Sequence, residues 1–70
     1  MIDEVLYMEA RVFREFCNRM SIPAKKANEI FNNYKIWEYI ESCYETLHLS
    51  GDECVIDDIE HILAKRGIKI

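Results

Sequence analysis

Four residues in the second half of the chain have the types and spacing to do chemistry together. Tyr44 and His48 are four residues apart and share one face of a helix, and Asp57 and Asp58 follow after a short connection. An imidazole beside a carboxylate is a common general acid/base pair. We expect Tyr44, His48 and one aspartate to meet where two helices join, because a buried imidazole needs a hydrogen-bond partner.

This polar cluster has two interpretations besides catalysis. It can act as a clamp that fixes two helices to each other, which is the interpretation we favour, or it can contact a partner. Catalysis is disfavoured because a few short helices within 70 residues leave little room for a cleft. We therefore expect a protein that is not an enzyme and has no catalytic residue.

The elements that must position these residues are expected to be amphipathic helices. Apolar residues recur at spacings of three, four and seven, and the stripe of the first segment is wide. The pattern covers three segments, at about residues 3–19, 22–33 and 36–47. Ser21 offers an N-cap for the second segment, with Pro23 in its first turn, and Gly51 ends the third.

The start of a fourth helix is open. Two capping-box spacings occur in this region, one beginning at Ser50 and the other at Asp57. The helix therefore begins near Gly51 or only near Asp58. Apolar residues keep helical spacing over residues 55–63, which favours the earlier start.

Chain length and composition limit the class of protein. Half of the 70 residues are hydrophobic, with two Gly and one Pro. We predict an all-α fold, a compact bundle of about four short helices that forms one domain over residues 1–70. Neither a signal peptide nor an apolar run as long as a membrane span is visible, so we expect a cytoplasmic protein without membrane contact.

The cysteine and histidine residues give no sign of a cofactor site. The three cysteines are an odd number without C-x-x-C spacing, which suits reduced thiols in the cytoplasm. The set Cys43, His48, Cys54 and His61 matches no familiar zinc pattern. A Gly-rich phosphate loop is also absent from the sequence. We therefore expect neither a metal ion nor a cofactor.

The charge pattern disfavours nucleic acid as a partner. Thirteen Asp and Glu against nine Lys and Arg give a net charge of −4, and the cations are scattered among acids. A helix-turn-helix would place Glu38, Glu41 and Glu45 of the third segment against phosphate. A DNA-binding transcriptional regulator is kept as an alternative function, and a self-associating structural domain is another.

Large rings at the margins of the third segment predict an interface. Four residues fill the inward stripe of this helix: Ile36, Ile40, Cys43 and Leu47. Trp37 and Tyr39 fall at the edges of that stripe. Glu38 and Glu41 lie beside them and could steer a basic surface. We take Trp37, Tyr39, Glu38 and Glu41 as candidate partner-binding residues.

The region around the polar cluster carries a family resemblance. The run Tyr44-x-x-Leu47-His48, the turn at Gly51 and the run Asp57-Asp58-Ile59 resemble short bacterial proteins known as domain of unknown function 3791. The resemblance extends from the first helix to about residue 62. It makes Tyr44, His48 and Asp58 signature residues. Leu49 departs from the small polar residue that is common after the histidine.

The resemblance also implies a kind of partner. Members of this family are often encoded beside, or fused to, a domain that looks like an ADP-ribosyltransferase, which suggests a toxin with its antitoxin or an enzyme with its accessory module. We therefore expect a protein-binding module whose partner is an ADP-ribosyltransferase-like toxin, or else self-association. An enzyme that holds a dinucleotide phosphate needs a positive cleft, which an acidic domain could cover.

Overall fold

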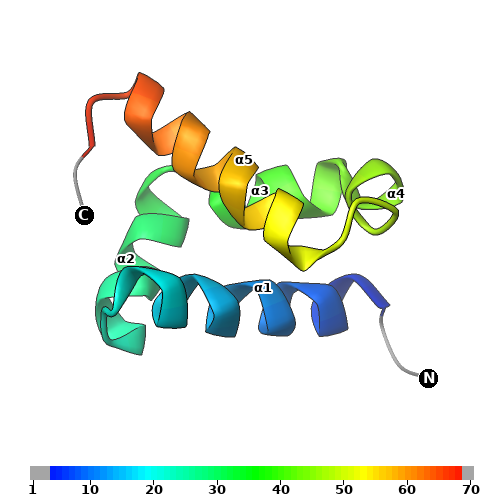
Figure 1. Cartoon of the computed structure of the whole chain (residues 1–70), viewed down its shortest axis with the longest axis horizontal. Helices are drawn as coiled ribbons and strands as arrows, with labels where there is room; N and C mark the ends of the chain where they lie inside the picture. The colour runs from blue at the N-terminus through cyan, green and yellow to red at the C-terminus, as the bar shows by residue number, and fades with distance from the viewer. Residues whose placement is uncertain (1–3, 69–70) are drawn as a thin grey trace.

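Every regular element in the described part of the chain, residues 4–68 of this computed structural model, is an α-helix. The five helices are α1 (Glu4–Met20), α2 (Ala24–Asn33), α3 (Ile36–Ser42), α4 (Tyr44–Leu47) and α5 (Asp52–Lys65). α1 runs along one side of the molecule, α5 crosses it, and α2 and α4 lie at opposite ends (Figure 1). The all-α prediction is confirmed, with five helices instead of about four. None of these helices is both long and apolar enough to cross a bilayer.

The connection between α1 and α2 differs from the expected cap. Ser21 has a φ of 54°, and the next residue, Ile22, donates its N–H to the carbonyl of Cys17 at 3.2 Å. A left-handed residue followed by such a bond is a common way to end a helix. Ser21 therefore closes α1 instead of capping α2, whose N-cap is Pro23 without a side-chain hydrogen bond. Asp3, the expected start of the first helix, lies outside the described residues.

The additional helix arises from a break at Cys43. Apolar spacing predicts one helix over residues 36–47, but Cys43 has φ −107° and ψ 13°, outside the helical region. Its carbonyl accepts the N–H of Leu47 at 2.8 Å, which starts α4 as a separate turn. No Gly or Pro occurs in this segment. We attribute the break to packing, because Ile36, Ile40 and Leu47 are all buried on the two sides of it.

α5 begins at the earlier of the two expected starts. Gly51 precedes its first turn with a φ of 85°, a conformation that glycine adopts at little cost. Asp52 and Glu53 then place negative charge at the N-terminal end of the helix, where the macrodipole favours it. Ser50 does not cap the helix, since its hydroxyl donates to the carbonyl of Thr46 at 3.4 Å.

The core lies where α1 packs against α2, α3 and α5. Its fully buried large side chains are Met8, Val12, Phe16, Phe31, Ile36, Ile40, Val55, Ile56, Ile59 and Leu63. The ring of Phe31 lies edge-on to three others, with its centroid 5.3 Å from Phe13, 5.1 Å from Phe16 and 4.8 Å from Trp37. Edge-on ring contacts add stability beyond the area they bury. This aromatic cluster therefore joins α1, α2 and α3.

Candidate functional site

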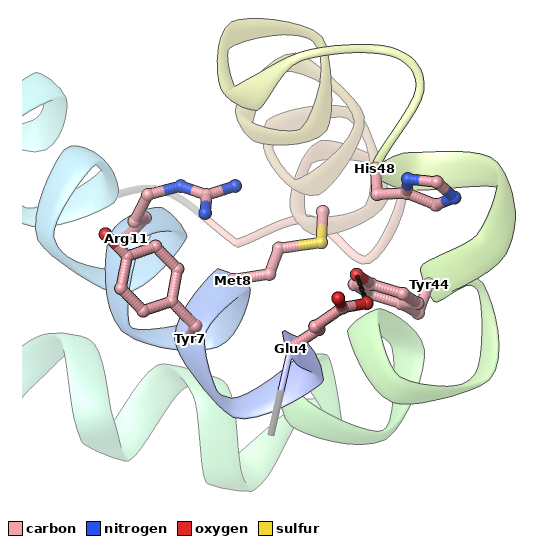
Figure 2. Close-up of a pocket in the computed structure, with 6 residues that line it drawn as sticks. All are labelled: Glu4, Tyr7, Met8, Arg11, Tyr44 and His48. Atoms are coloured by element: carbon pink, nitrogen blue, oxygen red, sulfur yellow. Dashed lines mark hydrogen bonds between the residues drawn. The ribbon is translucent and has the colours of Figure 1, made fainter. Parts of the chain in front are cut away.

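Tyr44, the first residue of α4, and His48, its C-cap residue, form a stacked pair. Their ring centroids are 4.9 Å apart and the ring planes differ by 16°. The hydroxyl of Tyr44 donates to a carboxylate oxygen of Glu4 at 3.1 Å, so this carboxylate comes from the first turn of α1 (Figure 2). The predicted meeting of the tyrosine and the histidine is confirmed, with Glu4 as the acid beside them.

The two aspartates of the predicted cluster have other neighbours. Asp57 pairs with Arg19 of α1, and Glu60 lies 3.5 Å from the same guanidinium. Asp58 is exposed on α5, and its charge acts on Tyr39 of α3. The predicted contact of His48 with an aspartate is wrong, because α5 begins at Asp52. Asp57 then lies about 9 Å along the helix axis from the joint, at 1.5 Å per residue.

A hollow of about 480 Å³ opens between α1 and α4, and we call it the α1–α4 hollow. The residues around it are Glu4, Tyr7, Met8, Arg11, Tyr44 and His48. Figure 2 shows Met8 between Tyr7 and Arg11 on one side and the stacked pair on the other. Met8 is 1% exposed and Tyr7 is 58% exposed, so one belongs to the core and the other to the surface.

Arg11 holds one wall of the α1–α4 hollow in place. Its Nε and one terminal nitrogen donate to the two carboxylate oxygens of Asp52 at 3.0 and 3.2 Å. Its guanidinium also lies 5.1 Å from the centre of the Tyr7 ring, within the range of a cation–π contact. Hydrogen bonding to Asp52 raises the pKa of Arg11 above its usual value. Arg11 is therefore a fixed positive charge whose counter-ion is Asp52.

A second hollow, also of about 480 Å³, lies on the other side of α1, and we call it the α1–α3 groove. Its lining residues are Leu6, Glu9, Ala10, Phe13, Trp37 and Glu41. Leu6 is 63% exposed, and Trp37 stacks on Phe13 with centroids 5.4 Å apart and planes at 21°. The groove therefore has an aromatic floor, an exposed apolar edge and two carboxylates.

The four candidate interface residues do not share one environment in the structure. Trp37 and Glu41 line the α1–α3 groove, while Tyr39 packs against the core and Glu38 is exposed beside the groove residues on the same helix. Sequence reasoning missed Leu6 as a surface residue because it falls within the wide apolar stripe of the first helix. The width of that stripe was the available signal. In a small bundle the neighbouring helices bury only part of so wide an apolar face, and the rest stays at the surface.

The pH response of Tyr39 offers a direct test of its partly buried position. Burial is the main cause that raises the pKa of Tyr39 above its ordinary value of about 10, and the charge of Asp58 adds to it. The folded protein thus favours the neutral phenol. We expect the difference between the 295 nm alkaline titrations of the native protein and Tyr39→Phe to have its midpoint above pH 10.

The same shift has a consequence for stability. A phenol whose pKa is higher in the folded than in the unfolded state contributes stability below about pH 10, and that contribution is lost as the pH rises through the folded pKa. Raising the pH above 10 should therefore lower the free energy of unfolding of the native protein more than that of Tyr39→Phe. Urea unfolding at each pH measures this difference. Equal losses, or a titration midpoint at or below pH 10, would contradict the assignment.

A family model described as a protein of unknown function (DUF3791) matches residues 8–66. Neither the curated proteins nor the solved structures contain a significant match. The matched region holds most of α1 and all of the other four helices, including Trp37, Tyr44 and His48.

Proposed function

The chain belongs to the DUF3791 family of proteins of unknown function, and we propose that it is a non-enzymatic protein-binding module. The observation that carries this proposal is the α1–α3 groove, where Leu6 is 63% exposed beside the rings of Phe13 and Trp37. Apolar surface of this kind beside polar residues is typical of protein interfaces. Trp is also among the residues that most often dominate binding energy.

The shape of the groove suits a helix as the bound element. Leu6, Ala10 and Phe13 are spaced by four and three residues along α1, and Trp37 faces them from α3. Recognition of an amphipathic helix uses an apolar groove of this kind, filled by side chains at i, i+3 or i+4, and i+7 of the partner. The small side chain of Ala10 leaves room for a close approach in the middle of the groove.

The charge of the groove suits a basic partner. Glu41 lines it and is exposed, Glu38 is exposed on the same helix, and the chain carries a net charge of −4, whereas Glu9 lines the groove from a buried position. The partner we propose is an ADP-ribosyltransferase-like toxin, which needs positive charge to hold a dinucleotide phosphate. Electrostatic complementarity of this kind increases the association rate and the specificity of a complex. The proposed biological role of the chain is to neutralise this toxin.

The test is a binding measurement with an ADP-ribosyltransferase-like protein, which the family resemblance leads us to expect among the products of genes beside this one. We expect a stable complex in size-exclusion chromatography, with a change in the fluorescence of Trp37, which is the single tryptophan. Leu6→Asp should weaken binding by about 2 kcal/mol, roughly thirtyfold, because it places a charge on the exposed apolar edge of the groove, which the partner would cover. Leu49→Asp is the matched control, because Leu49 is 79% exposed and lies outside the groove.

Each outcome of this measurement has a distinct meaning. The absence of a complex with the native chain would refute the proposed partner. A complex that Leu6→Asp and Leu49→Asp form with native affinity would place the interface elsewhere on the molecule. Both replaced side chains are exposed, so we expect both variants to keep their helices. Circular dichroism checks this.

A further inference from the structure

We propose that the α1–α4 hollow is a receptor for the side chain of one arginine of a protein partner. The hollow brings together the rings of Tyr7 and Tyr44, the buried thioether of Met8 and the carboxylate of Glu4. The inference rests on the proposed function because it assumes a protein partner. It goes beyond that function by naming a second recognition element and the residue it takes.

The side chains that form the walls of the hollow are held in position, and the space between them is open. Tyr7 is covered by Arg11, and Arg11 is fixed by two hydrogen bonds to Asp52. On the other side Tyr44 is fixed by its hydrogen bond to Glu4 and by stacking on His48. Between them about 480 Å³ of space remains open to solvent. A preformed site of this kind binds without the cost of ordering its own side chains.

The charges of the hollow select a cation. The positive charge of Arg11 is paired with Asp52, whereas Glu4 accepts a hydrogen bond from the neutral hydroxyl of Tyr44. Because that hydroxyl carries no charge, Tyr44 does not neutralise the negative charge of Glu4. An anion would be repelled by Glu4, and an apolar side chain would cover its carboxylate without a counter-charge. A basic side chain can make a cation–π contact with the rings and also neutralise the carboxylate.

The aromatic walls favour arginine over lysine. A guanidinium is planar and stacks on aromatic rings, and its two parallel N–H groups match the two oxygens of a carboxylate. The methylene groups of an arginine can lie along the exposed Tyr7 ring while its charged end reaches Glu4. A lysine ammonium is more strongly hydrated and offers no flat surface to the rings.

A small probe tests this hollow without any partner protein. The full chain, labelled with ¹⁵N, is titrated with Nα-acetyl-arginine methylamide and separately with the neutral isostere Nα-acetyl-citrulline methylamide. We expect saturable shifts of amides around Glu4, Met8 and His48, with the citrulline compound at least about fivefold weaker. Glu4→Gln should weaken arginine binding by about fivefold, as for an exposed ion pair. Glu45→Gln, an exposed carboxylate on the same helix as Tyr44, should have no effect.

The outcomes separate this proposal from the proposed function. Equal binding of the arginine and citrulline compounds, shifts outside the hollow, or no saturable shift would overturn it. Nα-acetyl-lysine methylamide binding as tightly as the arginine compound would overturn the preference for a guanidinium. Because the titration uses the chain alone, its failure leaves the Leu6→Asp experiment at the α1–α3 groove unaffected, and the reverse also holds.

Discussion

Phe31→Ala is expected to remove a large part of the stability of this chain. Phe31 is fully buried, and its ring lies within 5.3 Å, centroid to centroid, of Phe13, Phe16 and Trp37. Truncation of a buried phenylalanine costs about 3–5 kcal/mol, from lost transfer energy and from the cavity left behind. A domain of 70 residues has a total of about 4–10 kcal/mol at 0.05–0.15 kcal/mol per residue. Urea unfolding followed by circular dichroism at 222 nm measures the loss.

A surface leucine provides the control for the Phe31 experiment. Leu49 is 79% exposed, so Leu49→Ala should change the free energy of unfolding by less than about 0.5 kcal/mol. A loss below about 2 kcal/mol for Phe31→Ala would show that the aromatic cluster repacks around the missing ring. In that case the junction of α1, α2 and α3 would depend on the aliphatic residues of the core.

The helices and much of the core follow from local patterns in the sequence. Val12 and Phe16 in α1, and Ile59 and Leu63 in α5, are each four residues apart and all four are buried. A spacing of this kind depends only on helix geometry, so it can be recognised without knowledge of the tertiary structure. The glycine at position 67, with a φ of 73°, ends α5 for an equally local reason.

The break at Cys43 could not be predicted in the same way. The segment has helical spacing and no helix breaker. The break appears because Ile36 and Ile40 before it, and Leu47 after it, must all reach the same core. Such a departure is decided by contacts between elements distant in the sequence. Tertiary packing commonly overrides local propensity in short segments.

The candidate site was predictable in part for a similar reason. The stacking of Tyr44 on His48 follows from their spacing of four residues, which is a local property. The acid that meets Tyr44 is Glu4, 40 residues away, and the partner of Asp57 is Arg19, 38 residues away. These pairings depend on how α1 packs against α4 and α5. The sequence alone offered several acids for each position and no basis for choosing among them.

The second large effect is expected at Trp37. Its place at the margin of the third helix predicts an interface residue whose removal leaves the helices intact. In the structure it also stacks on Phe13 at 5.4 Å and lies edge-on to Phe31 at 4.8 Å. Trp37→Ala should therefore lower the free energy of unfolding by about 2–3 kcal/mol, less than Phe31→Ala because Trp37 is only half-buried. Circular dichroism during urea unfolding gives this value without need of tryptophan fluorescence.

Trp37→Phe separates the two roles of this side chain. A phenyl ring retains contact with Phe13 and Phe31, so we expect a loss of stability below about 1.5 kcal/mol, as for a conservative hydrophobic exchange. The smaller ring leaves part of the α1–α3 groove unfilled, so partner binding should weaken while the protein stays folded. If Trp37→Ala instead keeps native stability and loses binding, the indole serves only the interface. If Trp37→Phe binds with native affinity, the tryptophan is a core residue that a partner does not use.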